Sequence, residues 1–204
     1  RIGGGFGGKQ EMVVEVLVAL AVLRLGEPVR YEFSRSDEFT TAPCRHPFRV
    51  DVTAAADASG VLTALAVDVL VDAGAYGNHS PGVMFHGCGE SMSVYRCANK
   101  RVDARAVYTN NLPSGAFRGY GLGQLIFAIE SALDQLAERL GIDPFDFRRR
   151  NVVVPGDDFV DAHVLDDDLT FGSYGLDQCL DLAQAALRRG NDIQAPPGPQ
   201  WRTG

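Results

Sequence analysis

The sequence of 204 residues lacks two features that would each define a broad class of protein. Basic residues are outnumbered by acidic ones and the net charge is −7, which argues against a nucleic-acid surface, because phosphate binding needs concentrated positive charge. No apolar run is long enough to cross a bilayer, and no signal peptide is recognisable. We therefore expect a protein that binds neither nucleic acid nor membrane.

The chain also lacks paired metal-ligand residues. Its four cysteines are scattered along the sequence: Cys44, Cys88, Cys97 and Cys179. None forms the close Cys-x-x-Cys pair of zinc or iron–sulfur sites, and neither His79 nor His86 has a second ligand at metal spacing. No metal held by protein side chains is expected. Scattered thiols are typical of reduced cysteines, which indicates a cytoplasmic location.

The most unusual stretch, residues 110–124, reads NNLPSGAFRGYGLGQ. Here Arg118 lies between glycines, with Phe117 and Tyr120 beside it, just before a long amphipathic segment. Glycines let the main chain approach a ligand closely, a helix N-terminus offers free N–H groups, and arginine adds a permanent forked donor. The stretch predicts a seat for an anionic or oxygen-rich ligand. A plain helix start, with the arginine paired to a carboxylate, is an equally good interpretation.

A second glycine-rich loop, residues 3–9, reads GGGFGGK and overlaps two nucleotide-binding motifs. The P-loop motif is weak, because Gln10 stands where serine or threonine would hold magnesium. The G-x-G-x-x-G motif lacks the strand that should precede it. A nucleotide-binding module at residues 3–8 remains an alternative. Phe6 is the side chain that stands out of this loop.

Hydrophobic periodicity predicts an α+β fold, with a mixed, mostly antiparallel sheet packed with helices. We expect strands at residues 29–33, 48–56, 61–73 and 100–108, the middle two forming a hairpin. We expect helices at residues 10–25, buried on all sides, at 123–140, from Asp143-Pro144 onward, and at 175–188.

Several connecting segments carry weaker predictions. Ser36 is expected to cap a short helix, and residues 73–82 to be irregular. The segment 45–47, Arg-His-Pro, is either a binding loop or a surface turn, and for His46 the surface turn is the favoured interpretation. The three arginines at 148–150 indicate a solvated helix end, and the acidic segment 152–169 matches no calcium loop.

The ends of the chain indicate a piece of a longer polypeptide. It opens without methionine directly on the glycine loop, and it closes on a proline-rich segment. We expect one domain over residues 1–190 and a flexible tail over 191–204.

In this order, GGGFGGK, GAFRGYG and the following helix resemble the molybdenum-binding subunit of the xanthine dehydrogenase and aldehyde oxidase family. The likeness also includes the motifs at residues 45–48, 109–114 and 149–151 and spans nearly the whole chain. It is closest to bacterial hydroxylases of purines and other N-heterocycles. The arginine in AFRG favours these enzymes over the carbon monoxide dehydrogenase branch. The resemblance implies part of a larger molybdopterin-binding domain.

The resemblance further implies a molybdopterin cofactor, in bacteria often the cytosine dinucleotide form, whose dithiolene sulfurs hold the molybdenum. Such enzymes hydroxylate an electron-poor C–H carbon of a small heterocyclic or aldehyde substrate, with water as the oxygen source. Electrons leave through 2Fe-2S clusters and FAD on other domains or subunits. The family's glutamate base lies outside this chain, so we expect the isolated chain to be inactive. An idle scaffold that only contacts electron-transfer subunits is a further alternative.

The resemblance also assigns residues by position. Phe6 and Arg118 should lie beside the molybdenum without ligating it, with cofactor contacts from nearby main chain: Gly5, Gly7, Ala116 and Phe117. Gln10 and His86 stand where the xanthine enzymes carry a glutamate and an arginine, and Tyr120 where they carry a phenylalanine that stacks on the substrate. Arg118 and Gln10 are the expected catalytic residues. The two replacements disfavour xanthine itself. All of this requires Phe6 and Arg118 to meet in space.

Overall fold

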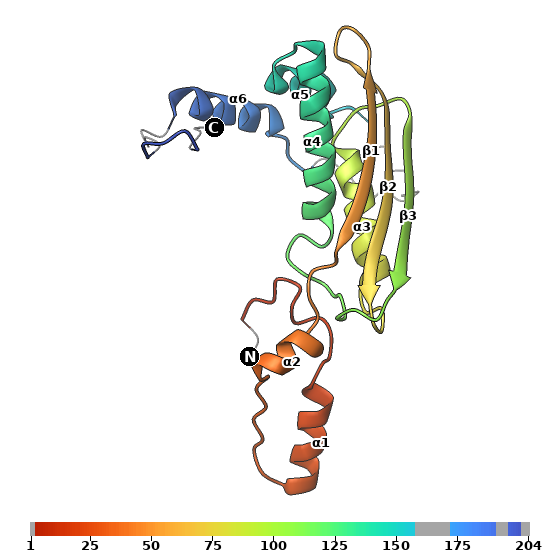
Figure 1. Ribbon diagram of the computed structural model, residues 1–204, viewed down its shortest axis with the longest axis vertical. Helices are drawn as coiled ribbons and strands as arrows, with labels where there is room; N and C mark the ends of the chain where they lie inside the picture. The colour runs from red at the N-terminus through yellow and green to blue at the C-terminus, as the bar shows by residue number, and fades with distance from the viewer. Residues whose placement is uncertain (1–2, 158–171, 191–195, 201–204) are drawn as a thin grey trace.

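The hairpin predicted near residues 48–73 is present, and it forms two strands of a three-stranded sheet (Figure 1). The computed structural model describes residues 3–157, 172–190 and 196–200. The elements follow the chain as α1 (Glu15–Leu25), α2 (Arg35–Thr40), β1 (Phe48–Ala56), β2 (Leu62–Gly74), α3 (Ser80–Ser93), β3 (Lys100–Tyr108), α4 (Leu122–Leu140), α5 (Pro144–Asn151) and α6 (Leu176–Arg189). The predicted α+β class is confirmed.

The sheet has the order β1-β2-β3 and is mixed. β1 pairs antiparallel with β2, whereas β3 pairs parallel with β2. The prediction of a mixed sheet is confirmed, but "mostly antiparallel" is wrong, because one of the two pairings is parallel. The reason is α3, which the sequence did not predict: it is the crossover that returns the chain to the end of the sheet where β2 began, as parallel pairing requires.

The core lies between the sheet and the pair α3 and α4, which cover one of its faces (Figure 1). β2 contributes apolar side chains that alternate with exposed ones, as the period of a strand demands. α4 contributes one buried stripe at helical spacing: Leu125, Ile129, Leu133 and Ala137. Four-residue spacing puts these side chains on one face of the helix, so the predicted amphipathic helix is confirmed.

α5 begins as the sequence predicts. The Asp143 carboxylate accepts hydrogen bonds from the backbone N–H groups of Phe145 and Asp146, and Pro144 occupies the first turn. At the other end, the buried Asn151 side chain accepts from the N–H of Leu62 and donates to the carbonyl of Gly60. The amide of Asn151 therefore ties α5 to the turn of the hairpin.

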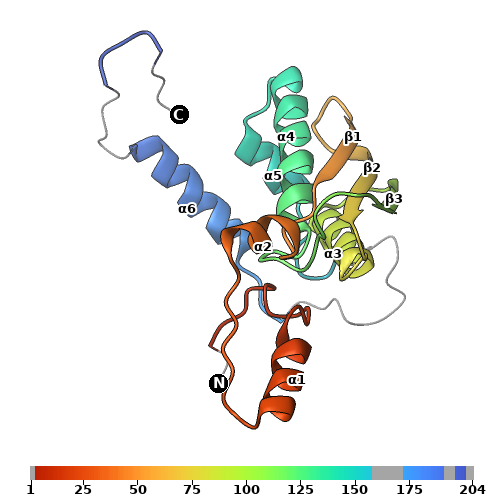
Figure 2. The ribbon, with the colours of Figure 1, turned by 60° about the horizontal axis from the view of Figure 1, so that its bottom comes forward.

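The first third of the chain departs from the predictions. α1 starts at Glu15, five residues later than expected, and none of its residues is buried by the part of the chain that the structure describes. It stands below the body of the molecule (Figures 1 and 2), and most of its large apolar side chains are exposed, among them Val16, Leu17 and Leu23. Residues 29–33 form no strand, so the strand predicted there is wrong, and the helix cap is Ser34 instead of Ser36.

Two predictions fall largely outside the described residues. The acidic segment 152–169 is described only as far as residue 157, and the tail 191–204 only at residues 196–200. The division into a domain at 1–190 and a tail stays a prediction. Among the described helices, none is long and apolar enough to span a membrane.

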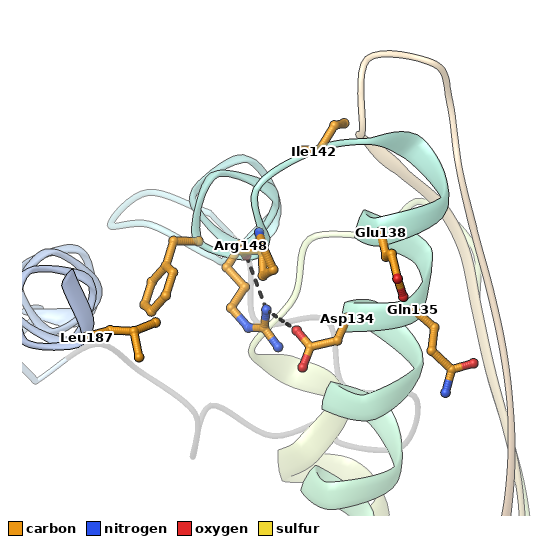
Figure 3. Close-up of a pocket in the computed structure, with 8 residues that line it drawn as sticks. Asp134, Gln135, Glu138, Ile142, Arg148 and Leu187 are labelled. Atoms are coloured by element: carbon orange, nitrogen blue, oxygen red, sulfur yellow. Dashed lines mark hydrogen bonds and ion pairs between the residues drawn. The ribbon is translucent and has the colours of Figure 1, made fainter. Parts of the chain in front are cut away.

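Arg148 is a structural residue and not part of a solvated helix end, which corrects the prediction for this one of the three arginines; Arg150 is exposed as predicted. Its side chain is only 16% exposed, and its guanidinium contacts the carboxylates of Glu130 at 2.6 Å and Asp134 at 2.8 Å. Tyr95 donates its hydroxyl to the same Glu130. Figure 3 shows Arg148 pointing at Asp134 in the wall of a hollow of about 700 Å³ between α4, α5 and α6.

Arg148→Ala should destabilise the chain by about 3 kcal/mol, because it leaves the partly buried Glu130 carboxylate, which also accepts the buried Tyr95 hydroxyl, without its cation. Arg30→Ala is the matched control: its ion pair with Glu32 is exposed, so the loss should stay below about 0.5 kcal/mol. Urea unfolding of the two variants measures the difference. Equal losses would show that the Arg148 network does not stabilise the fold.

Candidate functional site

The two glycine-rich loops meet, although more than half of the chain separates them. Gly7 has φ +88° and packs on the second loop so closely that a Cβ there would lie 2.7 Å from the Phe117 nitrogen. The Arg118 Cζ lies 5.4 Å from the centre of the Phe6 ring, which is a cation–π distance. In the described part of the chain Arg118 forms no ion pair, so the plain helix start with a paired arginine is not what the structure shows.

Glu11 fastens the first loop to the second. Its Oε1 accepts a 2.8 Å hydrogen bond from the Ala116 N–H. Gly115 makes room for it, because a Cβ at that position would lie 2.4 Å from the same oxygen. The sequence carries one signal for this contact, a carboxylate in a largely apolar run directly after the glycine loop.

Arg45 supports the second loop from its other side. Its Nη2 donates to the Arg118 carbonyl at 2.7 Å, and its Cζ lies 4.6 Å from the centre of the Phe117 ring. The segment 45–47 thus contacts the site, as one of its two interpretations had it. The surface-turn interpretation is wrong for His46, whose side chain is 2% exposed and whose Nε2 lies 2.8 Å from the Ser80 Oγ.

Burial lowers the pKa of the His46 imidazole from its ordinary value of 6.5. The unfolded chain therefore takes up a proton there near pH 6.5, and the folded chain only at lower pH. Below about pH 6.5 the unfolded state binds more protons, so stability should fall as the pH falls, by up to about 1.4 kcal/mol per pH unit.

His46→Gln should flatten this dependence, because glutamine does not titrate in this range. Urea midpoints at about pH 7.5 and about pH 5.5 compare the variant with the wild type. If both proteins lose the same stability between the two pH values, His46 is not the group responsible.

The turn that carries Arg118 has an unusual backbone. Gly119, Tyr120 and Gly121 all have positive φ, at +91°, +44° and +94°. Gly121 rests on α3, where a Cβ would lie 2.3 Å from the Val83 carbonyl oxygen. Within the described residues, the N–H groups of 117–119 donate to no protein acceptor. The turn therefore presents free amides next to the exposed Arg118 guanidinium, an arrangement suited to an anionic ligand.

A pocket of about 460 Å³ opens where these elements converge. It is lined by Phe6, Gly7, Gln10, His79, His86, Phe117, Arg118, Gly119 and Tyr120. The three residues expected to contact substrate, Gln10, His86 and Tyr120, thus share one pocket with Phe6 and Arg118. The sequence did not single out His79 as a site residue.

Two expected site residues do not line the pocket. Ala116 is buried, and Glu11 occupies its N–H. The Gly5 carbonyl accepts from the N–H of Gly8 inside the first loop. Both support the loops that form the pocket, and a direct cofactor contact by either stays a prediction.

The charge of the pocket is positive. Its lining holds one arginine and two histidines and no carboxylate. Glu90 lies behind the lining, with its Oε1 2.7 Å from the His86 Nδ1. In the described chain no group of three His, Cys, Asp or Glu side chains could hold a metal ion. The donor set of guanidinium, amides and aromatic faces fits a flat, anionic group.

This fold, with a pocket between its two glycine-rich loops, is that of a domain suited to bind an anionic cofactor. The model of the molybdopterin cofactor-binding domain family matches residues 1–152, and the chain belongs to this family. Its relatives place it among the xanthine dehydrogenase and aldehyde oxidoreductase proteins, as the resemblance predicted. The family membership is thereby confirmed.

Two curated relatives and one solved structure illustrate the similarity. The chain is 38% identical over 156 residues to a probable xanthine dehydrogenase subunit of Bacillus subtilis, covering 76% of this chain and 21% of that protein. It is 37% identical over 182 residues to the nicotinate dehydrogenase large molybdopterin subunit of Eubacterium barkeri, covering 89% and 42%. It superposes on the aldehyde oxidoreductase of Desulfovibrio gigas with a TM-score of 0.79 and 33% identity, covering 92% of this chain and 20% of that one.

Proposed function

We propose that the chain forms the molybdenum-facing and substrate-facing wall of a molybdenum hydroxylase that acts on a purine or another N-heterocycle, with an aldehyde as the second choice. The chain spans about a fifth of the length of its Bacillus subtilis relative, so catalysis belongs to a longer protein. The contact between Phe6 and Arg118 carries the proposal, because it brings both glycine loops to one pocket.

The residues on the cofactor side of the pocket have roles that their chemistry supports. Arg118 and the neighbouring free amides hold the anionic cofactor in place and stabilise negative charge that develops during the reaction. When bound, the molybdenum cofactor supplies the redox chemistry of C–H hydroxylation with water as the oxygen source. Phe6 limits the space beside the cofactor.

The substrate side of the pocket favours a heterocycle. Tyr120 offers an aromatic edge or face to a flat ring, and Gln10 offers both a donor and an acceptor. Glu90 orients the His86 imidazole toward the same space. Two relatives are named for xanthine and nicotinate, both of them N-heterocycles. Gln10 and His86 cannot copy a glutamate and arginine pair, which disfavours xanthine itself.

The proposal extends to cofactor form and partners. We expect the cytosine dinucleotide form of molybdopterin, with 2Fe-2S and FAD carried elsewhere in the assembly. The relatives are molybdenum subunits of larger dehydrogenases, which supports further subunits. The exposed apolar side chains of α1, such as Leu17 and Leu23, supply surface that such an assembly would cover.

The alternative nucleotide-binding module is less well supported. Gly7 packs the first loop on the second, which leaves less main chain free to wrap a pyrophosphate. An idle scaffold would not need a pocket lined by Arg118, Gln10 and His86.

The test is to purify the full-length protein with its partners and to measure molybdenum, pterin and turnover of purine, hypoxanthine, nicotinate and an aldehyde. We expect about one molybdenum and one pterin per protein, together with hydroxylation of a heterocycle. The isolated chain should retain no molybdenum and show no turnover. Retention of NAD or FAD by residues 3–8 and absence of pterin would support the nucleotide-binding alternative instead.

A further inference from the structure

Tyr120 lies between two imidazole rings, one on α3 and one on the residue that precedes this helix. The Tyr120 hydroxyl is 2.7 Å from the Nδ1 of His79, the N-cap residue of α3. The two rings meet edge to face with 5.9 Å between their centres, and the His86 ring on α3 lies 5.5 Å from Tyr120. The hydroxyl therefore has a fixed partner inside the pocket.

The backbone of α3 is shaped to receive this hydroxyl. A Cβ at Gly82 would lie 2.7 Å from the Tyr120 oxygen, so a side chain there would displace the hydroxyl from its present position. Tyr120 itself has φ +44°, a conformation that side-chain-bearing residues seldom adopt and that persists only where surrounding contacts hold it. The hydrogen bond to His79 is one such contact.

His79 is itself anchored to the second glycine-rich loop. The preceding Asn78 donates its side-chain amide to the Ser114 carbonyl at 3.2 Å. The following Ser80 is buried against His46. These contacts hold the backbone on both sides of His79, and the hydrogen bond to the Tyr120 hydroxyl orients its ring.

We propose that His79 is a positioning residue for Tyr120, and that the hydroxyl held in this way is a hydrogen-bond partner for a lactam edge, the adjacent C=O and N–H groups of an oxo-substituted N-heterocycle. The inference rests on the proposed function and narrows its substrate class.

The chemistry of the pair allows this in either tautomer of His79. If Nδ1 accepts a hydrogen bond from the phenol O–H, the oxygen keeps a lone pair that can accept the N–H of a lactam. If Nδ1 carries the proton and donates, the phenol keeps its own proton for the C=O. Burial and the nearby Glu11 raise the pKa of Tyr120, so the phenol stays protonated at neutral pH. The charged or titratable groups around it are His79, His86, Glu11 and Arg118.

The experiment uses the full-length protein with its partners and compares two probes, hypoxanthine, which has a lactam edge, and purine, which has none. Calorimetry gives the Kd of each probe for four proteins: the wild type, Tyr120→Phe, His79→Ala and the double variant. Tyr120→Phe should weaken hypoxanthine binding by about tenfold, the effect of one hydrogen bond, and purine binding by less than about twofold.

His79→Ala should reproduce this loss, and the double variant should be no weaker than either single variant, because both act through one hydroxyl. His79→Asn should restore part of the discrimination, since its amide can reach the phenol. Tyr76→Phe, at a tyrosine that is 87% exposed, is the matched control and should change neither Kd.

The inference is overturned if the wild type does not prefer hypoxanthine to purine, if His79→Ala weakens both probes equally, or if the two losses add in the double variant. If His79→Ala does not fold, Tyr120→Phe alone still decides whether the hydroxyl reads the lactam. Failure of the proposed function would appear separately, as a wild-type protein without molybdenum and turnover.

Discussion

Arg118→Ala should lower kcat of the full-length enzyme by about 10- to 1,000-fold, the range observed when one charge-stabilising donor is removed. Arg118 is exposed in this chain and contacts the Phe6 ring, so its removal should leave the fold intact. KM should change less than kcat if the guanidinium acts mainly on charge that develops in the transition state. Steady-state kinetics with molybdenum content measured on the same sample separates lost turnover from lost cofactor.

The matched control is Arg105→Ala, which removes an exposed arginine from β3, away from the pocket. Its kcat should stay within about twofold of the wild type, as for surface substitutions generally. Arg118→Lys should restore only part of the activity, because an ammonium cannot reproduce the forked donor. Wild-type kinetics for Arg118→Ala would remove this residue from the catalytic machinery.

Gly7→Ala should lower the molybdenum content of the full-length protein by about 10-fold or more, because the strain of a misplaced Cβ is about 1–3 kcal/mol or higher. The new Cβ would lie 2.7 Å from the Phe117 nitrogen and 2.8 Å from the Ala116 carbonyl carbon, and main chain cannot step aside as a flexible side chain can. Gly7 also has φ +88°. The two loops should separate, and with them Phe6 and Arg118.

Gly3→Ala is the control for this substitution, because nothing lies within 4 Å of the Cβ it would add. It should keep its molybdenum. The two variants add the same methyl group to the same glycine-rich loop, so general effects of alanine on this loop cancel. Equal molybdenum contents in Gly7→Ala and Gly3→Ala would show that the close packing of the loops does not build the cofactor site.

Local signals explain what could be predicted from the sequence. β1 alternates apolar and polar residues from Phe48 to Thr53, and α4 carries one stripe at four-residue spacing, so periodicity alone indicated both. Asp143 and Pro144 are a standard helix start. The meeting of Phe6 and Arg118 was predicted in another way, from the order of motifs in a family, because no local rule relates residues so far apart.

The missed elements depend on tertiary contacts. α3 contains Gly82, Gly87 and Gly89, which lower helix propensity, and its apolar spacing is weak. Two of these glycines are explained by the site: Gly82 leaves space for the Tyr120 hydroxyl, and a Cβ at Gly87 would lie 3.1 Å from the Gly121 carbonyl carbon. A pattern that looks irregular in the sequence is thus a helix shaped to hold the turn that carries Arg118.

The missed site residues have partners distant in sequence. His79 pairs with Tyr120, and Glu11 with the Ala116 N–H, across long intervals that no spacing rule covers. Arg148 sits in a run of three arginines, and only its contacts with Glu130 and Asp134 distinguish it from its exposed neighbour Arg150. α1 is the opposite case: its apolar sequence indicated burial, but the described residues do not cover it.

Anomalous diffraction at the molybdenum absorption edge, from crystals of the full-length enzyme, would locate the metal without reference to activity. It therefore decides whether the two glycine-rich loops build the molybdenum site. We expect a single molybdenum peak in the pocket lined by Phe6, Gln10 and Arg118, with no protein side chain as its ligand. A molybdenum peak elsewhere in the protein, or a fully occupied pterin site that leaves Phe6 and Arg118 on a remote surface, would show that these loops do not form it.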